Sequence, residues 1–196
     1  MSDTSDISDK NRKLAKHAAA VFGGHPSANR VSDTSGKSFI DVMSAADSPR
    51  RALTSFATFG LSDHPNKGGA KGKALPVEIV GACASDVRGF EKAISTAAFN
   101  IINSGWPCFA GAIFPDCLEM YGLSKTMKHF FFIKPCLWTE DLVPLKLGKK
   151  TITWLLAVPV SEEERRFAEK DGPARLDKLL EKKRIDIPDV ARPSVL

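Results

Sequence analysis

One apolar segment late in the chain does most to limit what this sequence can fold into. Residues 152–158 read ITWLLAV, so a strand formed there carries apolar side chains on both of its faces. Such a strand lies inside a sheet that is covered on both sides, because neither face is suited to contact with water. The full apolar run, residues 152–160, has 9 residues, whereas a membrane-spanning helix needs about 20. We therefore expect a buried central strand and no membrane span.

A helix start follows this strand directly. Ser161-Glu-Glu-Glu164 has the spacing of a capping box, in which the serine hydroxyl and the last carboxylate each satisfy a free backbone amide. The pattern predicts a helix through Lys170. Asp171-Gly172 then breaks it, and Pro173 begins a second helix that ends near residue 184, followed by an extended tail. The inward-facing leucines of this second helix are Leu176, Leu179 and Leu180.

Apolar spacing also predicts the elements of the first two thirds of the chain. A helix is expected over residues 11–22, ended by Gly23-Gly24. A longer helix is expected from an N-cap at Asp86 to Ser104, because its apolar residues repeat with a period of about 3.6. Residues 24–49 are expected to be an irregular connection with one short strand. Further strands are predicted over residues 53–59, 77–83, 108–114 and 129–138, the last of them central because it is apolar on both sides.

Length and composition predict the domain organisation. The chain has 196 residues, of which 43% are hydrophobic and 26% charged, as is typical of globular proteins. Residues 1–10 are rich in Ser and Asp and are predicted to be a disordered tail without the apolar stretch of a secretion signal, and residues 11–196 a single domain. The four cysteines lie 25, 9 and 19 residues apart, which matches no zinc-site spacing. We expect a cytoplasmic protein with reduced thiols.

The positive charge is concentrated in one segment. The formal net charge of the chain is +5, and residues 121–150 alone carry six lysines against two acidic residues, with no arginine. A nucleic-acid-binding surface usually combines a dense Lys/Arg stripe with exposed aromatic side chains. The nearby aromatic residues, Phe130–Phe132 and Trp138, belong instead to a predicted strand. We therefore expect solvated lysines and no nucleic-acid partner.

Sequence patterns that would support catalysis are weak. No G-x-S-x-G motif occurs, and no cysteine has the flanking residues of a known nucleophile. In the loop Gly60–Lys73, Gly68 and Gly72 are too close together for a P-loop, and Ala74 stands where a hydroxyl would hold magnesium. Asp63-His64 alone is more typical of a turn than of a metal site. We predict no catalytic residues, no metal and no cofactor; the alternative is a hydrolase or deaminase that uses Asp63, His64 and a cysteine.

Two motifs, in this order, resemble a known domain. Thr58-Phe59-Gly60-Leu61-Ser62-Asp63 closes a predicted strand and resembles the T/S-x-G-L-S-D motif of suppressor-of-fused domains. The strand at residues 152–158, its continuation Pro159–Glu164 and the final segment Asp189–Val195 resemble the C-terminal half of that domain. The resemblance covers about residues 45–196. It implies an α+β fold in which a twisted, mainly antiparallel (mixed) sheet is backed by helices.

The resemblance also implies a function by binding. The animal member of the family is longer and sequesters a transcription factor, whereas bacterial members of this size resemble immunity proteins (antitoxins) that neutralise a toxin encoded beside them. The resemblance therefore implies that this chain is a non-enzymatic protein whose partner is a cognate toxin. The alternative is a regulatory module that sequesters an endogenous protein. The oligomeric state is left open.

Polar loops on a rigid sheet are the best candidates for contact with a partner. The candidates are the loops around Gly60–Lys73 and the basic segment Lys125–Lys150. The candidate partner-binding residues are Asp63, His64, Lys67, Lys71, Lys73, Lys146, Lys149 and Lys150. Because opposite charges speed association, we expect the partner to be neutral or acidic where it touches these residues.

Overall fold

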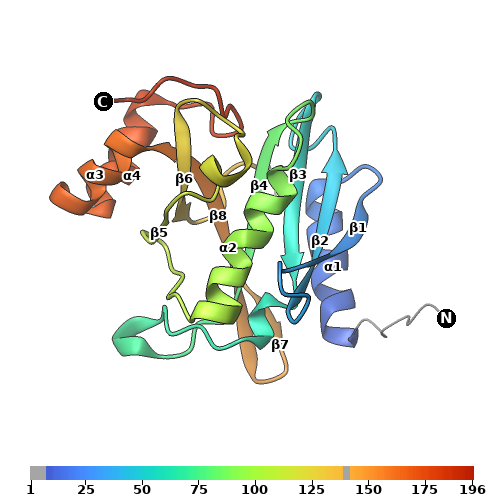
Figure 1. The fold of residues 1–196 in the computed structure, drawn as a ribbon. Helices are drawn as coiled ribbons and strands as arrows, with labels where there is room; N and C mark the ends of the chain where they lie inside the picture. The colour runs from blue at the N-terminus through green and yellow to red at the C-terminus, as the bar shows by residue number, and fades with distance from the viewer. Residues whose placement is uncertain (1–7, 139–141) are drawn as a thin grey trace.

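A single mixed sheet organises the molecule (Figure 1). The structure is a computed structural model and describes residues 8–138 and 142–196. In this part of the chain the strands follow the order β1-β2-β3-β4-β8-β6-β5, with β7 paired to β8 off this path. All pairs are antiparallel except β4 and β8, which run parallel over Val77–Val80 and Thr153–Leu156. The predicted α+β fold with a mainly antiparallel sheet is confirmed. The strands are β1 Ser27–Ser32, β2 Phe39–Ala46, β3 Leu53–Phe59, β4 Val77–Ala84, β5 Ile113–Phe114, β6 Met127–Ile133, β7 Leu145–Leu147 and β8 Lys150–Ser161.

Helices cover both faces of the sheet. α2 crosses the front face in the view of Figure 1, and α1 lies behind the sheet. α3 and α4 follow β8 and pack against each other near the C-terminus. α1 and α4 contribute to one apolar cluster and α2 to the other, so the sheet separates two cores. The helices are α1 Asp9–Phe22, α2 Phe90–Ser104, α3 Glu162–Asp171 and α4 Pro173–Lys183.

β8 is buried on both faces, as its apolar run predicts. Leu155 and Ala157 pack into the core beneath α2. Trp154, Leu156 and Val158 point the other way, into the core shared by α1 and α4. Successive side chains of a strand alternate between faces, so this one run contributes to both cores.

A buried ion pair joins the first turn of α3 to the C-terminal tail. The predicted capping box is present between Ser161 and Glu164. The Glu164 carboxylate also accepts hydrogen bonds from Arg192, Nη1 to Oε1 at 2.7 Å and Nη2 to Oε2 at 2.8 Å, and one from the backbone N–H of Val195. Glu164 is 0% exposed and Arg192 5%. The tail, predicted only to be extended, is therefore fixed against α3.

Several predicted boundaries are wrong. Residues 24–49 contain two paired strands, β1 and β2, rather than an irregular connection with one short strand. The sequence did not indicate β1, because its side chains are mostly exposed on both faces and show no apolar alternation. α2 begins at Phe90 after a left-handed Gly89, so Asp86 is not its N-cap. The strand predicted over 108–114 is reduced to β5. The strand predicted over 129–138 ends at Ile133 and lies between β8 and the short β5.

The N-terminal boundary also differs slightly from the prediction. α1 begins at Asp9, and the Ser8 side chain caps it by accepting a hydrogen bond from the N–H of Asn11. Residues 1–7 of the predicted tail lie outside the described residues, and the division into a tail and one domain stays a prediction. No helix in the described part is both long and apolar enough to cross a membrane.

Candidate functional site

Of the two segments predicted to bind a partner, the loop Gly60–Lys73 and the last part of the basic segment Lys125–Lys150 lie at one end of the molecule. Lys128 of that segment lies elsewhere, in β6, where it pairs with Glu119. The β3–β4 connection, residues 60–76, and the β7–β8 hairpin both extend from the lower end of the sheet in Figure 1. Asp63 connects them, because its Oδ1 lies 3.7 Å from Nζ of Lys150 and 2.5 Å from Nζ of Lys10 in α1. Lys10 also donates a hydrogen bond to Ser62 Oγ at 3.1 Å. Segments that are distant in sequence therefore form one surface.

A buried glutamate holds the first part of the β3–β4 connection. Glu78 of β4 is 0% exposed, and its carboxylate accepts the backbone N–H groups of residues 60, 61 and 62 at 3.0 to 3.3 Å. It also accepts the hydroxyl protons of Ser62 and Thr58, at 2.7 and 2.8 Å. Gly60, whose φ is +99°, permits the turn that directs three amides at one carboxylate. This contact explains why the G-L-S motif follows β3.

The stability of the protein is expected to fall as the pH rises through the range in which Glu78 ionises. Burial raises the pKa of Glu78 to about 7, against the opposing hydrogen bonds from Ser62 and Thr58 and the charge of Lys10. A glutamate in the unfolded chain ionises near its ordinary pKa of 4.5. Between these values folding takes up a proton, so the free energy of unfolding decreases with rising pH, by about 3 kcal/mol in total.

Chemical denaturation of the wild type and of Glu78→Gln, at about pH 5 and about pH 7.5, measures this effect. Glutamine does not titrate, so the difference in unfolding free energy between the two proteins should change between the two pH values. An unchanged difference would show that Glu78 does not take up a proton on folding.

Asn66 ties the middle of the same connection to the segment after α2. Its buried Nδ2 donates to the carbonyls of Leu75 and Cys108 at 2.9 and 2.8 Å, and its Oδ1 accepts the N–H groups of Cys108 and Gly68 at 2.9 and 3.1 Å. Gly68 packs so closely that an added Cβ would lie 2.2 Å from the carbonyl oxygen of Cys108. The connection is therefore held at two places, by Glu78 and by Asn66.

Gly68→Ala is expected to separate this loop from Cys108 and to lower the free energy of unfolding by about 1 to 3 kcal/mol. The backbone carbonyl that the new methyl group would meet has no flexible end that can move away. Urea denaturation measures the loss, and faster amide exchange at Cys108 locates it. Ala70→Ser, at an exposed position of the same loop, is the matched control; equal stability of the two variants would contradict the prediction.

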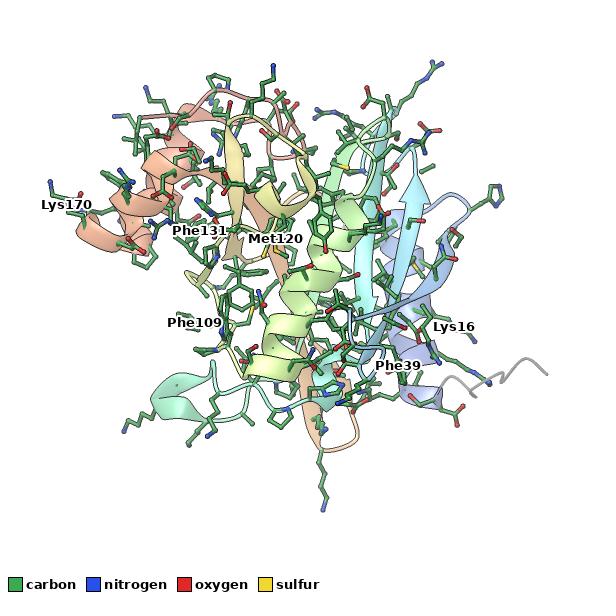
Figure 2. All side chains as sticks on the ribbon, in the orientation of Figure 1. Lys16, Phe39, Phe109, Met120, Phe131 and Lys170 are labelled. Carbon is green, nitrogen blue, oxygen red and sulfur yellow. The ribbon has the colours of Figure 1, made fainter. Side chains whose placement is uncertain are left out.

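The lysines at this end project into solvent. Figure 2 shows side chains with nitrogen tips extending from both the β3–β4 connection and the β7–β8 hairpin. Among the described residues, only Lys150 of this group takes part in an ion pair. We call this group the lysine-rich end; its six exposed members are Lys67, Lys71, Lys73, Lys146, Lys149 and Lys150.

The alternative enzymatic interpretation uses His64 and a cysteine. Burial lowers the pKa of His64, and in the described part of the chain this residue makes no hydrogen bond to a cysteine. Burial raises the pKa values of Cys83 and Cys117 to about 12 and also raises that of Cys108. Protonated thiols are weak nucleophiles. Within residues 8–138 and 142–196, no group of three or more His, Cys, Asp or Glu could hold a metal ion.

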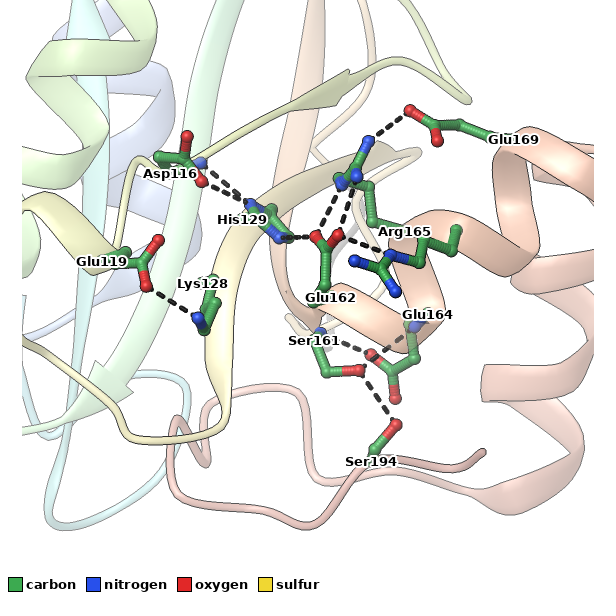
Figure 3. A network of polar contacts seen from close by, with 11 residues as sticks. Asp116, Glu119, Lys128, His129, Ser161, Glu162, Glu164, Arg165, Glu169 and Ser194 are labelled. Atoms are coloured by element: carbon green, nitrogen blue, oxygen red, sulfur yellow. Dashed lines mark hydrogen bonds and ion pairs between the residues drawn. The ribbon is translucent and has the colours of Figure 1, made fainter.

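A second polar cluster lies at the start of α3 (Figure 3). Nδ1 of the buried His129 accepts the backbone N–H of Asp116 at 2.9 Å, and its Nε2 lies 2.9 Å from Oε2 of Glu162. Because Nδ1 accepts, Nε2 carries the proton and donates it. Arg165, Arg166 and His129 all donate to Glu162 and hold the pKa of this carboxyl well below its usual range. Both ring nitrogens of His129 are occupied, so this cluster joins β6 to α3.

Glu78 and Asn66 were absent from the predicted site. Glu78 had a detectable signal, since it is the single charged residue of the strand VEIVGACA and a buried charge needs hydrogen-bond partners. No sequence signal indicated the role of Asn66, because its partner Cys108 is 42 residues away in the chain.

Comparison with known proteins bears out the resemblance seen in the two motifs. The family model described as "Suppressor of fused protein (SUFU)" matches residues 36–193. "Immunity protein YqcF" of Bacillus subtilis (strain 168) is 42% identical over 190 residues, which span 97% of this chain and 99% of that protein. The crystal structure of a putative SUFU homolog from Neisseria gonorrhoeae FA 1090 superposes with a TM-score of 0.72 at 14% identity, over 96% of this chain and 97% of that one. The crystal structure of the Sufu–Fu complex superposes with a TM-score of 0.67 at 12% identity, over 95% of this chain and 92% of that one. At these identities, the two solved structures support the fold alone.

Proposed function

Because this chain belongs to the suppressor of fused family, we propose that it is an immunity protein that binds a bacterial toxin and blocks it without catalysis. The observation that carries this proposal is the 42% identity to an immunity protein over 97% of the chain. A likeness that extends over nearly the whole of both proteins supports a shared role better than a match to one motif would. We place the protein in the cytoplasm of the cell that makes the toxin.

The geometry is consistent with blocking by a preformed surface. Glu78 and Asn66 hold the β3–β4 connection in one conformation, so little conformational entropy would be lost when it meets a partner. Asp63, His64 and the lysine-rich end supply polar groups on this rigid support. These residues are our candidates for contact with the toxin.

Co-expression tests the proposal. A candidate toxin domain, taken from the gene next to that of this protein, is expressed in a bacterial host with and without this protein, and survival is expected only when both are present. A toxin domain carrying an inactivating substitution removes lethality as a complication, and the two proteins are expected to elute together from gel filtration. Death of the co-expressing cells together with separate elution would refute the proposal.

The regulatory alternative has one supporting observation, which is that the same fold occurs in the Sufu–Fu complex. Under this alternative the chain would sequester a protein of its own cell. Affinity purification from the native cell distinguishes the two, because the first proposal expects the toxin and the second expects a regulator. An enzymatic role would instead appear as turnover that is lost in His64→Ala while binding is retained.

A further inference from the structure

We infer that the lysine-rich end is the surface that docks the toxin and that the toxin's matching surface is acidic. This inference rests on the proposed function. It follows from the charge distribution, the rigidity of the two loops and their shared position at one end of the sheet. Each of these points is independent of the family likeness.

The whole net charge of the protein lies at this end. Residues 60–73 and 145–150 contain six lysines and one acidic residue, Asp63, which is a net +5 and equals the formal net charge of the chain. The rest of the chain carries 22 basic and 22 acidic residues. Because the remainder carries equal numbers of both charges, the excess positive charge of the protein comes from the lysine-rich end. Opposite charge raises the association rate of a partner by steering it to such a patch.

The surface is also fixed in shape. The β3–β4 connection is anchored at its start by Glu78 and in its middle by Asn66. Asp63 lies 3.7 Å from Lys150, so the hairpin and the connection lie side by side. Polar loops held by a rigid sheet are common binding elements. A surface of this kind presents its charges in a constant arrangement, which a complementary partner can match.

A protein partner fits this surface better than a nucleic acid does. Residues 60–73 and 145–150 contain no arginine and no Phe, Tyr or Trp. Nucleic-acid surfaces typically use arginine forks for phosphates and aromatic rings for base stacking. An acidic protein surface requires no rings for base stacking, and its carboxylates can pair with lysines alone.

The test reverses charge at one residue from each loop. Lys71→Glu/Lys149→Glu changes two exposed lysines that have no ion-pair partner among the described residues. The matched control is Lys178→Glu/Lys182→Glu on the exposed side of α4, which changes the net charge equally. The probe is the inactivated toxin domain. Its association rate constant is measured by stopped-flow or surface plasmon resonance at about 50 mM and about 500 mM salt, where screening differs strongly.

The association rate constant for the Lys71/Lys149 variant is expected to fall about 10-fold at low salt and to approach the wild-type value at high salt. The control should change the rate less than about 2-fold, because its charges lie at the other end of the molecule. Equal rates for the variant and the control would overturn the inference, as would tight, salt-dependent binding of a duplex DNA or RNA probe. If the wild type itself does not bind the toxin domain, the proposed function fails; if it binds and the variant binds equally well, only the docking surface is wrong.

Discussion

Replacement of Arg192 by alanine is expected to lower the free energy of unfolding by about 3 to 5 kcal/mol. Arg192 donates two hydrogen bonds to the carboxylate of Glu164 and one to the carbonyl of Pro159, all in a buried setting. Without the guanidinium, the Glu164 charge stays buried and loses its counterion. The loss therefore includes the cost of an uncompensated buried charge as well as the lost hydrogen bonds.

Urea denaturation of Arg192→Ala measures this loss. The matched control is Arg175→Ala, which removes an exposed helical ion pair with Asp171 and should cost no more than about 0.5 kcal/mol. The double variant Glu164→Gln/Arg192→Met removes both charges and should recover a large part of the stability. Similar losses for Arg192→Ala and Arg175→Ala would mean that the tail is not held by this pair.

Glu78→Ala is expected to lower the free energy of unfolding by about 4 kcal/mol. Five buried or half-buried donors meet at the Glu78 carboxylate, and each donor left without a partner costs about 1 to 3 kcal/mol unless water replaces the acceptor. The Gly60–Ser62 turn should also lose its fixed conformation, which amide exchange of these three residues would detect. Glu181→Ala, at an exposed position of α4, is the matched control.

The functional result of Glu78→Ala follows from the same contact. Glu78 has no exposed surface, so it cannot touch a toxin. If the lysine-rich end is the docking surface, the variant should bind the toxin domain more weakly at a temperature where it is still folded. Unchanged affinity in a variant with a mobile Gly60–Ser62 turn would show that the turn is not part of the contact.

Patterns that depend on neighbouring residues predicted their structures well. The capping box at Ser161–Glu164 and the helix break at Gly172 are confirmed, because each is a hydrogen-bonding or backbone preference within a few residues. The strand at β3 and the double-sided burial of β8 are also confirmed, since period and hydrophobicity suffice to recognise them. β1 lacked any such pattern, because an edge strand with two exposed faces needs no apolar residues.

The geometry of the candidate site was only half predictable for a similar reason. Exposed residues such as Asp63 and Lys149 could be proposed from loop composition and charge, and the structure places both loops at one end of the sheet. Glu78 and Arg192 were missed because their partners come from other elements, and the sequence carries no record of which buried donors face which carboxylate. A lone charge inside an apolar strand indicates that such a partner exists, but it does not identify the partner.

The position of β8 has a consequence for synthesis of the protein. β8 comes after β1 to β6 in the chain, yet it lies between β4 and β6 in the sheet. A ribosome releases the chain from its N-terminus, so β1 to β4 can pair early while the outer edge of β4 remains open. That edge is an unpaired apolar strand, which readily joins other chains. Nascent chains that end before residue 161 are therefore expected to associate more readily than the full chain, and the tail can be fixed against α3 only after Arg192 has been added.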